Sequence, residues 1–323
     1  MKRATWLTLV ILGGMMIFNC ASSKKTPEPK ELYDNTAARQ TAYKSYDKIM
    51  KHWPVDYTEE WIETDFGISH LIISGPADAK PVILFAGLFA DATMWYANVG
   101  PLAEHYRVIC PDQMTYGGKS QPTGKPILNI NDYAAWYDQL LSYFGYDKAA
   151  VGGLSYGSWL GLALARETPE SISAIIMLDP SETFTKMDGG IAWRGFRDFM
   201  WFPNRDKYRR FFDWMGGGFS TPESDLWLEH MLDVIQYGSI GMFDIPQHRI
   251  YTADELTNVT MPVLIMAGGK PIVYKDPEVF AQAAALALPH AEIVIVPGTG
   301  HSLNVEKADV VNAKMVNFLV DNY

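Results

Sequence analysis

A serine flanked by glycines lies near the middle of the chain, in the run GLSYG at residues 153–157. The apolar residues 149–151 before it are typical of a short buried strand, and residues 156–166 after it have a helical pattern. A serine on so sharp a turn projects its hydroxyl, and the helix that follows favours negative charge developing at its N-terminus. The glycines allow close approach of the neighbouring backbone. Ser155 is therefore predicted to be a catalytic nucleophile.

A general base for this serine is predicted at His301, in the run PGTGHSL at residues 297–303. This loop follows the last predicted strand and precedes the last predicted helix, so it can reach the same edge of a sheet as Ser155. A neutral imidazole can take the serine proton and return it to the leaving group. The other six histidines lack such a setting and are predicted to be surface or cap residues: His52, His70, His105, His230, His248 and His290.

The elements that would position these residues alternate between apolar runs and helical patterns. This alternation predicts an α/β fold, with a mostly parallel central sheet covered by helices on both faces. Strands are expected at 60–64, 69–73, 81–85, 107–110, 149–151, 173–178, 263–267 and 292–296, and helices at 36–53, 93–104, 131–144, 156–166, 276–287 and 308–319.

The alternation stops at residues 181–258, which are too long for a connecting loop and have a largely helical pattern. We interpret this segment as a helical cap inserted into the core, which then comprises residues 35–180 and 259–323. The cap is rich in aromatic residues, which could form an apolar lid over a pocket. Packing of the cap helices against the core accounts for most of them, and periodicity does not decide whether the cap also contacts a membrane.

Over roughly residues 60–320 the sequence resembles the α/β-hydrolase superfamily, in its order of strands, its serine turn and its final Gly-His loop. The run DQMTYGGKS, residues 112–120, resembles the D-x-x-G-x-G-x-S loop of that superfamily, in which the aspartate (here Asp112) is usually structural. Trp53-Pro54-Val55 after the first helix, Phe66-Gly67 and Gly75-Pro76 resemble bacterial members of the lipase and carboxylesterase type.

The resemblance implies an oxyanion hole made of two backbone N–H groups. One is expected from Tyr156, directly after the nucleophile. The other is expected from the turn after the strand at 81–85, where the family usually has His-Gly and this chain has Ala86-Gly87-Leu88-Phe89. Because the donor is a backbone group, replacement of the histidine need not abolish activity, and we assign the second donor to Leu88.

The sequence offers more than one interpretation of the acid that would orient His301. The family usually places it after the strand at 263–267, but Pro271 occupies that position here. One interpretation places the acid after the preceding strand, as in haloalkane dehalogenases and pancreatic-type lipases, and Asp179 stands in that place. Asp276 and Glu182 are weaker candidates. Alternatively, the site is a dyad or is inactive.

The N-terminus has the pattern of a targeting segment. Lys2 and Arg3 precede an apolar run at residues 6–18, which is too short to span a membrane. Cys20 follows, so residues 1–20 resemble a bacterial lipoprotein signal, with Cys20 as the lipidated residue and residues 21–34 as a tether. An ordinary export signal or an uncleaved anchor is the alternative. Cys110 would then be the remaining cysteine, in a buried strand.

Composition narrows the functional classes. The formal net charge is −10, which argues against a nucleic-acid partner. We find no metal-ligand cluster, phosphate-binding loop or cofactor motif, and no indication of an oligomeric state. The leading hypothesis is a cofactor-independent serine hydrolase of the bacterial cell envelope, a carboxylesterase that cleaves small or medium apolar esters through an acyl-enzyme. The alternatives are a lipid-anchored binding protein on a hydrolase fold, or hydrolysis of C–C, amide or lactone bonds by the same residues.

Overall fold

The computed structural model describes residues 31–217, 221–239 and 244–323. The predicted signal peptide with Cys20, and the tether up to residue 30, lie outside these residues. Within the described ranges, none of the helices has both the length and the apolar character needed to cross a bilayer.

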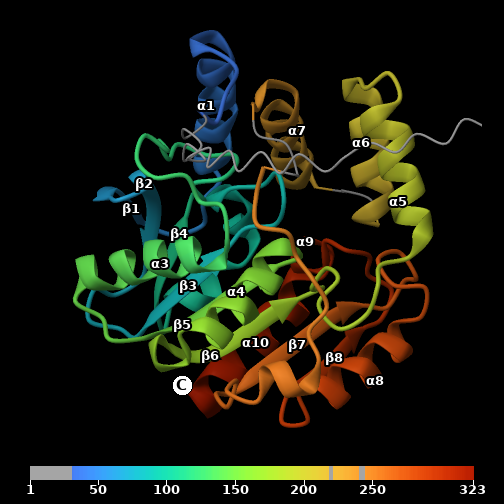
Figure 1. Cartoon of the computed structure of the whole chain (residues 1–323). Helices are drawn as coiled ribbons and strands as arrows, with labels where there is room; N and C mark the ends of the chain where they lie inside the picture. Colours follow the sequence, from blue (N-terminus) through green and yellow to red (C-terminus); the bar gives the residue numbers. More distant parts are fainter. Residues whose placement is uncertain (1–30, 218–220, 240–243) are drawn as a thin grey trace, which may run out of the picture.

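The described residues form one eight-stranded sheet that crosses the centre of the molecule (Figure 1). Its spatial order is β1-β2-β4-β3-β5-β6-β7-β8. The first two pairings, β1 with β2 and β2 with β4, are antiparallel, and all others are parallel. The central strands are continuous apolar runs because both faces of the sheet are covered. The strands are β1 (Tyr57–Thr64), β2 (Gly67–Ser74), β3 (Pro81–Phe85), β4 (Arg107–Pro111), β5 (Ala149–Leu154), β6 (Ile172–Leu178), β7 (Val263–Gly268) and β8 (Glu292–Val296).

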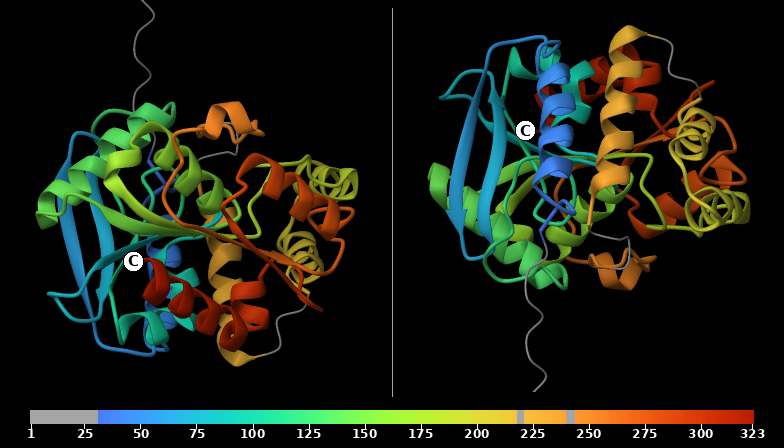
Figure 2. Two further views of the ribbon diagram at one scale, coloured as in Figure 1. Left: turned by 90° about the horizontal axis from the view of Figure 1, so that it is seen from below. Right: turned by 90° about the horizontal axis from the view of Figure 1, so that it is seen from above.

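Helices cover the two faces of this sheet (Figure 2). Helices α3 (Ile130–Phe144) and α4 (Tyr156–Glu167) lie on one face, and α2 (Val99–Ala103) and α10 (Ala308–Asn322) lie on the other. Helix α8 (Pro277–Ala287) packs beside β8, and α9 (Leu303–Glu306) precedes α10. The expected α/β-hydrolase architecture is therefore confirmed. The single helix expected at 93–104 is instead a 3-10 helix, η1 (Ala92–Ala97), followed by α2.

The predicted helical insertion lies between β6 and β7. It contains α5 (Gly189–Gly195), the π-helical turn η3 (Phe196–Met200), α6 (Arg205–Met215), α7 (Pro222–Tyr237) and the 3-10 helix η4 (Ala253–Leu256). Figure 1 shows α5, α6 and α7 on the same side of the sheet as α1 (Thr36–Met50), which packs against α7. Several cap aromatics are buried as helix packing requires, but others are exposed: Phe211, Phe212 and Trp227 belong to the first group, and Trp193, Phe196, Trp201 and Phe202 to the second.

The end of the predicted tether belongs to the folded core. Leu32 and Tyr33 are buried against residues of α1. The Tyr33 hydroxyl donates a hydrogen bond to the Gly118 carbonyl at 2.9 Å, and Tyr33 forms an isolated β-bridge with Gly238 after α7. The prediction of a tether up to residue 34 was wrong at these positions, because two apolar side chains gain more from burial than from solvent exposure.

Candidate active site

Ser155 lies on the turn between β5 and α4, with a backbone φ of 56° and ψ of −116°. A positive φ is unfavourable for a residue with a Cβ atom, and it is tolerated here because the surrounding backbone fixes the turn. A Cβ on Gly157 would lie 2.2 Å from the Phe85 carbonyl oxygen, and one on Gly153 would lie 2.2 Å from the Gly157 carbonyl carbon. The two glycines of the sequence motif are therefore required because β3, β5 and α4 meet at this point.

His301 and Asp179 form a hydrogen-bonded pair. The distance from His301 Nδ1 to Asp179 Oδ2 is 2.6 Å, and both side chains are buried. Asp179 directly follows β6, and its other oxygen, Oδ1, accepts a hydrogen bond from the Gly268 N–H at 3.2 Å. Because the carboxylate accepts a hydrogen bond from the Nδ1–H group, the other ring nitrogen, Nε2, is left to exchange a proton elsewhere.

The other carboxylates considered from the sequence are engaged with different partners. Asp276 caps the N-terminus of α8, where its Oδ1 accepts a hydrogen bond from the Glu278 N–H at 2.9 Å. Glu182 lies 3.4 Å from Nε2 of His248, a different histidine. The structure thus brings Asp179 to His301, and it does not bring Asp276 or Glu182 there.

Both segments predicted to supply the oxyanion donors pass beside the nucleophile. Tyr156 is the first residue of α4, and the first amides of a helix have no acceptor within the helix. Leu88 follows Gly87, where an added Cβ would lie 3.6 Å from the Ser155 Cβ. Phe89 has a φ of 64°, which shows that the chain makes a tight turn here. The turn after β3 therefore passes directly beside the serine.

A sequence model of the α/β hydrolase family matches residues 82–314. The chain belongs to the α/β hydrolase family. A Bacillus subtilis protein described as an uncharacterized carboxylesterase, nap, is 26% identical over 286 residues, covering 85% of this chain and 91% of the relative. The carboxylesterase YbfK of the same organism is 25% identical, with 86% and 93% covered.

Solved structures share the fold of this α/β hydrolase. The crystal structure of naproxen esterase (carboxylesterase NP) from Bacillus subtilis superposes with a TM-score of 0.79 at 24% identity, covering 88% of this chain and 99% of that one. With carboxylesterases among its relatives, the protein is a carboxylesterase-like hydrolase of the α/β fold.

The serine turn of this hydrolase is held by Ser158, which sequence reasoning missed. The Ser158 Oγ lies 2.6 Å from the Gly153 carbonyl oxygen and accepts a hydrogen bond from the Leu178 N–H at 2.8 Å. It thereby connects the start of α4 to the ends of β5 and β6. A small polar residue in an otherwise apolar, buried stretch of helix was the signal that could have identified it.

The loop that carries His301 is fixed from two sides. The Glu306 carboxylate accepts a hydrogen bond from the Gly300 N–H, at 2.8 and 2.9 Å to its two oxygens. Burial raises the pKa of Glu306, against the opposing effects of the Gly300 N–H and of Lys270. On the other side, the His301 N–H donates to the carbonyl of Met215 at the end of α6, at 2.8 Å. A cap helix therefore helps to place the histidine.

Aromatic rings surround the serine turn. The ring of Phe89 is stacked 6.0 Å from that of Phe199 in the cap, and it lies 6.5 Å from that of Tyr116. Tyr116 in turn contacts Tyr156, whose hydroxyl donates to the Pro246 carbonyl at 2.8 Å. These rings make the surroundings of the serine turn largely apolar. Among the described residues, no group of three or more potential metal ligands is present.

His230 is also hydrogen-bonded between a serine and an aspartate. Its Nδ1 lies 2.8 Å from Ser45 Oγ, and its Nε2 lies 2.7 Å from Asp91 Oδ2. All three side chains are buried, and Ser45 lies within α1 with its hydroxyl also 3.0 Å from the Ala42 carbonyl oxygen. The group connects α1, α7 and the turn before η1, so its geometry is that of a structural contact. His230 lies in the cap segment as expected, but on its buried side.

His70 was expected at the surface, and this prediction was wrong. It is buried in β2, with Nδ1 2.7 Å from Asp112 Oδ2 and Nε2 3.1 Å from Glu59 Oε2. Asp112 also accepts hydrogen bonds from the Ala92 N–H at 2.9 Å and the Lys119 N–H at 2.7 Å, so it holds its loop as the sequence suggested. A buried histidine is stable here because both ring nitrogens face carboxylates.

Proposed function

We propose that this protein cleaves small or medium apolar carboxylic esters through an acyl-enzyme. The observation that carries the proposal is the pairing of His301 with Asp179 at 2.6 Å, at the sheet edge where Ser155 stands on its positive-φ turn. The names of the Bacillus subtilis relatives, both carboxylesterases, support the choice of ester over other acyl substrates. The aromatic rings of Phe89 and Tyr156 beside the serine turn support the preference for apolar acyl groups.

In the proposed reaction, Ser155 Oγ attacks the ester carbonyl carbon while His301 Nε2 takes the hydroxyl proton. The carbonyl oxygen becomes negatively charged and accepts hydrogen bonds from the N–H groups of Leu88 and Tyr156. The C–O bond to the alcohol then breaks, and His301 returns the proton to the departing alcohol. Water repeats the sequence on the acyl-enzyme, which releases the acid and restores Ser155. Asp179 stabilises the charged imidazole in both halves.

Labelling with a fluorophosphonate probe tests the nucleophile. We expect the full chain to be labelled, the label to disappear in Ser155→Ala, and ester hydrolysis to fall at least about 10⁴-fold. Ser45→Ala is the matched control, because Ser45 also contacts a histidine that is paired with an aspartate. Labelling should persist in that variant.

The absence of labelling in a folded wild-type protein would reject the enzyme and favour the lipid-anchored binding protein considered from the sequence. The reason for that alternative was Pro271 at the usual position of the acid. The Asp179 carboxylate beside His301 weakens this reason, because it can serve as the acid. A panel of ester, amide, lactone and C–C substrates distinguishes the remaining reactions. A faster turnover of any other class than of esters would overturn the ester assignment.

We also propose that Cys20 is lipidated and anchors the protein in the cell envelope. The support is the order of a positive start, a short apolar run, a cysteine and a polar stretch in residues 1–30. In detergent phase partition of the full chain, Cys20→Ser should move the protein to the aqueous phase. Cys110→Ala should leave it in the detergent phase, because Cys110 is fully buried. Equal partition of both variants would contradict lipidation.

A further inference from the structure

Four aromatic side chains protrude from the cap between residues 193 and 202. They are four of the seven exposed aromatic side chains of the described residues, and their exposed fractions are 62% for Trp193, 48% for Phe196, 58% for Trp201 and 80% for Phe202. Trp193 and Phe196 are stacked with ring centroids 6.1 Å apart. Exposed apolar rings concentrated in so short a segment are characteristic of an interaction surface.

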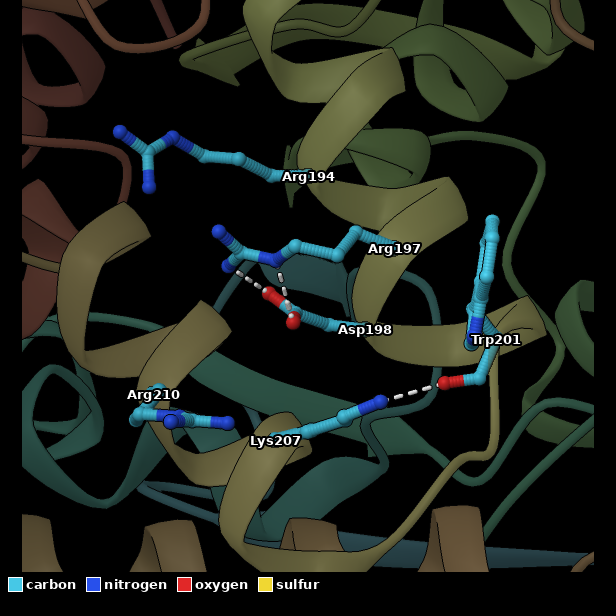
Figure 3. Close-up of a pocket in the computed structure, with 6 residues that line it drawn as sticks. All are labelled: Arg194, Arg197, Asp198, Trp201, Lys207 and Arg210. Carbon is cyan, nitrogen blue, oxygen red and sulfur yellow. Dashed lines mark hydrogen bonds and ion pairs between the residues drawn. The ribbon is translucent and has the colours of Figure 1, made fainter.

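Cations accompany these rings. Between α5 and α6 lies a cavity of about 710 Å³, which is lined by Arg194, Arg197, Asp198, Trp201, Lys207 and Arg210. Figure 3 shows the arginines of the α5–η3 segment and the cations of α6 reaching toward this space from opposite sides. We call these four cations and the four exposed aromatics the cap-tip surface.

The charge of this surface differs in sign from that of the whole chain. Residues 189–215 contain six arginine or lysine residues and three aspartates, whereas the chain has a formal net charge of −10. The Asp198 carboxylate is paired with Arg197. Arg205 and Arg209 are paired with carboxylates of α7, so they do not contribute to the cap tip. Arg194 stacks on the ring of Trp214 at 4.4 Å. Among the ion pairs of the described residues, none joins Arg194 to a carboxylate.

We propose that the cap-tip surface docks on a membrane rich in anionic lipids. The cations would meet the phosphate groups, and the aromatic rings would enter the boundary between headgroups and acyl chains, which is where tryptophan and phenylalanine are favoured. A small soluble anion would account for the cations, but it would leave the ring of Phe202 in water. An anionic lipid surface accounts for both the cations and the exposed aromatic rings of the cap-tip surface.

Docking at this place would bring the membrane close to the candidate active site. Phe199 follows the exposed Trp193 and Phe196 within the same helical segment, and its ring stacks on Phe89 in the turn beside Ser155. The end of α6 is hydrogen-bonded to the His301 backbone through Met215. The proposal itself does not depend on hydrolysis, so an inactive Ser155→Ala protein should dock equally well.

The experiment places a polarity-sensitive fluorophore at the cap tip. Phe202→Cys and, separately, Val320→Cys are labelled in the full chain with Cys20→Ser; Cys110 is buried and is not expected to react. Val320 is 62% exposed on α10, and Figure 1 shows the C-terminus that follows this helix far from α5 and α6. With vesicles containing equal phosphatidylglycerol and phosphatidylcholine, the label at 202 should shift to the blue, and the label at 320 should not. Vesicles of phosphatidylcholine alone should give a much weaker response.

Charge variants distinguish docking through the cap-tip surface from binding through the N-terminal segment and from recognition of one specific headgroup. Replacing Arg194 and Arg210 by Gln should raise the lipid concentration for half-maximal shift about thirtyfold, since each cation near an anionic surface contributes a factor of about five. Replacing both by Lys, or Lys125 by Glu, should leave it nearly unchanged. If the label at 202 stays in water on anionic vesicles, as expected if the surface binds an acidic protein, the proposal is overturned. An equal loss of vesicle binding in the Lys and Gln variants also overturns it.

Discussion

The Asp179 carboxylate accepts two hydrogen bonds, one on each oxygen. The donors are the Gly268 N–H and the His301 Nδ1–H, at 3.2 and 2.6 Å. Asp179 itself has a φ of 41°, a left-handed conformation that aspartate and asparagine tolerate better than most residues. An ionised carboxylate serves both donors because it is an acceptor at either oxygen. At the scale of the single residue, this double role determines the tautomer of His301.

Asp179→Asn should reduce kcat for a soluble ester by about 10⁴-fold with little change in KM. The amide has one oxygen, and if this accepts from Gly268 its NH₂ group faces His301 and favours the wrong tautomer. Steady-state kinetics with circular dichroism as a folding check measure the effect. Asp276→Asn is the control, because asparagine caps a helix as well as aspartate does and this carboxylate does not contact His301. Wild-type turnover in Asp179→Asn would remove Asp179 from the mechanism.

At the scale of elements, the candidate site depends on contact between the backbones of β3, β5 and α4. The absent side chains of Gly153 and Gly157 allow this contact, and Ser158 connects α4 to the end of β6. The nucleophile is therefore positioned by main-chain packing, which no side-chain rearrangement can replace.

Gly157→Ala should separate α4 from β3, because its Cβ would lie 2.2 Å from the Phe85 carbonyl oxygen. We expect a loss of about 1–3 kcal/mol or more in the free energy of unfolding, together with loss of hydrolysis. Gly161→Ala is the matched control on the same helix. Its Cβ would have ordinary contacts, with Val151 Cγ2 at 3.4 Å. Alanine is a better helix former than glycine, so this variant should keep activity and be at least as stable.

Urea unfolding of both variants measures these differences. A Gly157→Ala protein that keeps wild-type stability and turnover would show that the backbone contact between α4 and β3 is not needed.

At the scale of the whole molecule, buried histidines connect the antiparallel edge and the cap to the core. His230 joins α1 to α7, and His70 joins β2 to the loop of Asp112 and to Glu59 on β1. Burial lowers the pKa of His70, but the Asp112 and Glu59 carboxylates outweigh this effect and raise it from 6.5 to about 9. His70 is therefore charged at neutral pH, and both of its ring nitrogens donate.

The stability of the fold should depend on this proton. Because the pKa of His70 is higher in the folded state than its ordinary value of 6.5, its contribution is fully present below pH 6.5 and is lost as the pH rises through about 9. We expect wild-type protein to lose up to about 3 kcal/mol from this source between pH 6.5 and 9.5. Urea unfolding across this range should show that the free energy of unfolding falls less steeply with pH for His70→Gln than for wild type. The variant His105→Gln, at an exposed position, should follow the wild type. Identical slopes for His70→Gln and wild type would contradict the assignment.

The sequence by itself determined the class of fold and the places of Ser155 and His301. The reason is that these depend on local patterns, namely apolar runs, helical periodicity and small residues at a sharp turn. The alternation of strands and helices also indicated the position of the cap, because a long segment without this alternation is visible in the sequence.

Only the tertiary structure decided which carboxylate lies beside His301. Asp179 is 122 residues away in the chain, and the two meet because β6, β7 and β8 are consecutive in the sheet and the loop after β8 passes over the end of β7 at Gly268. The burial of Tyr33 and His70 likewise involves partners far along the chain, which are Gly118 and Asp112. The exposure of Trp201 and Phe202 could not be predicted from the sequence either. An apolar residue in a helical segment has the same sequence pattern whether or not another element covers it.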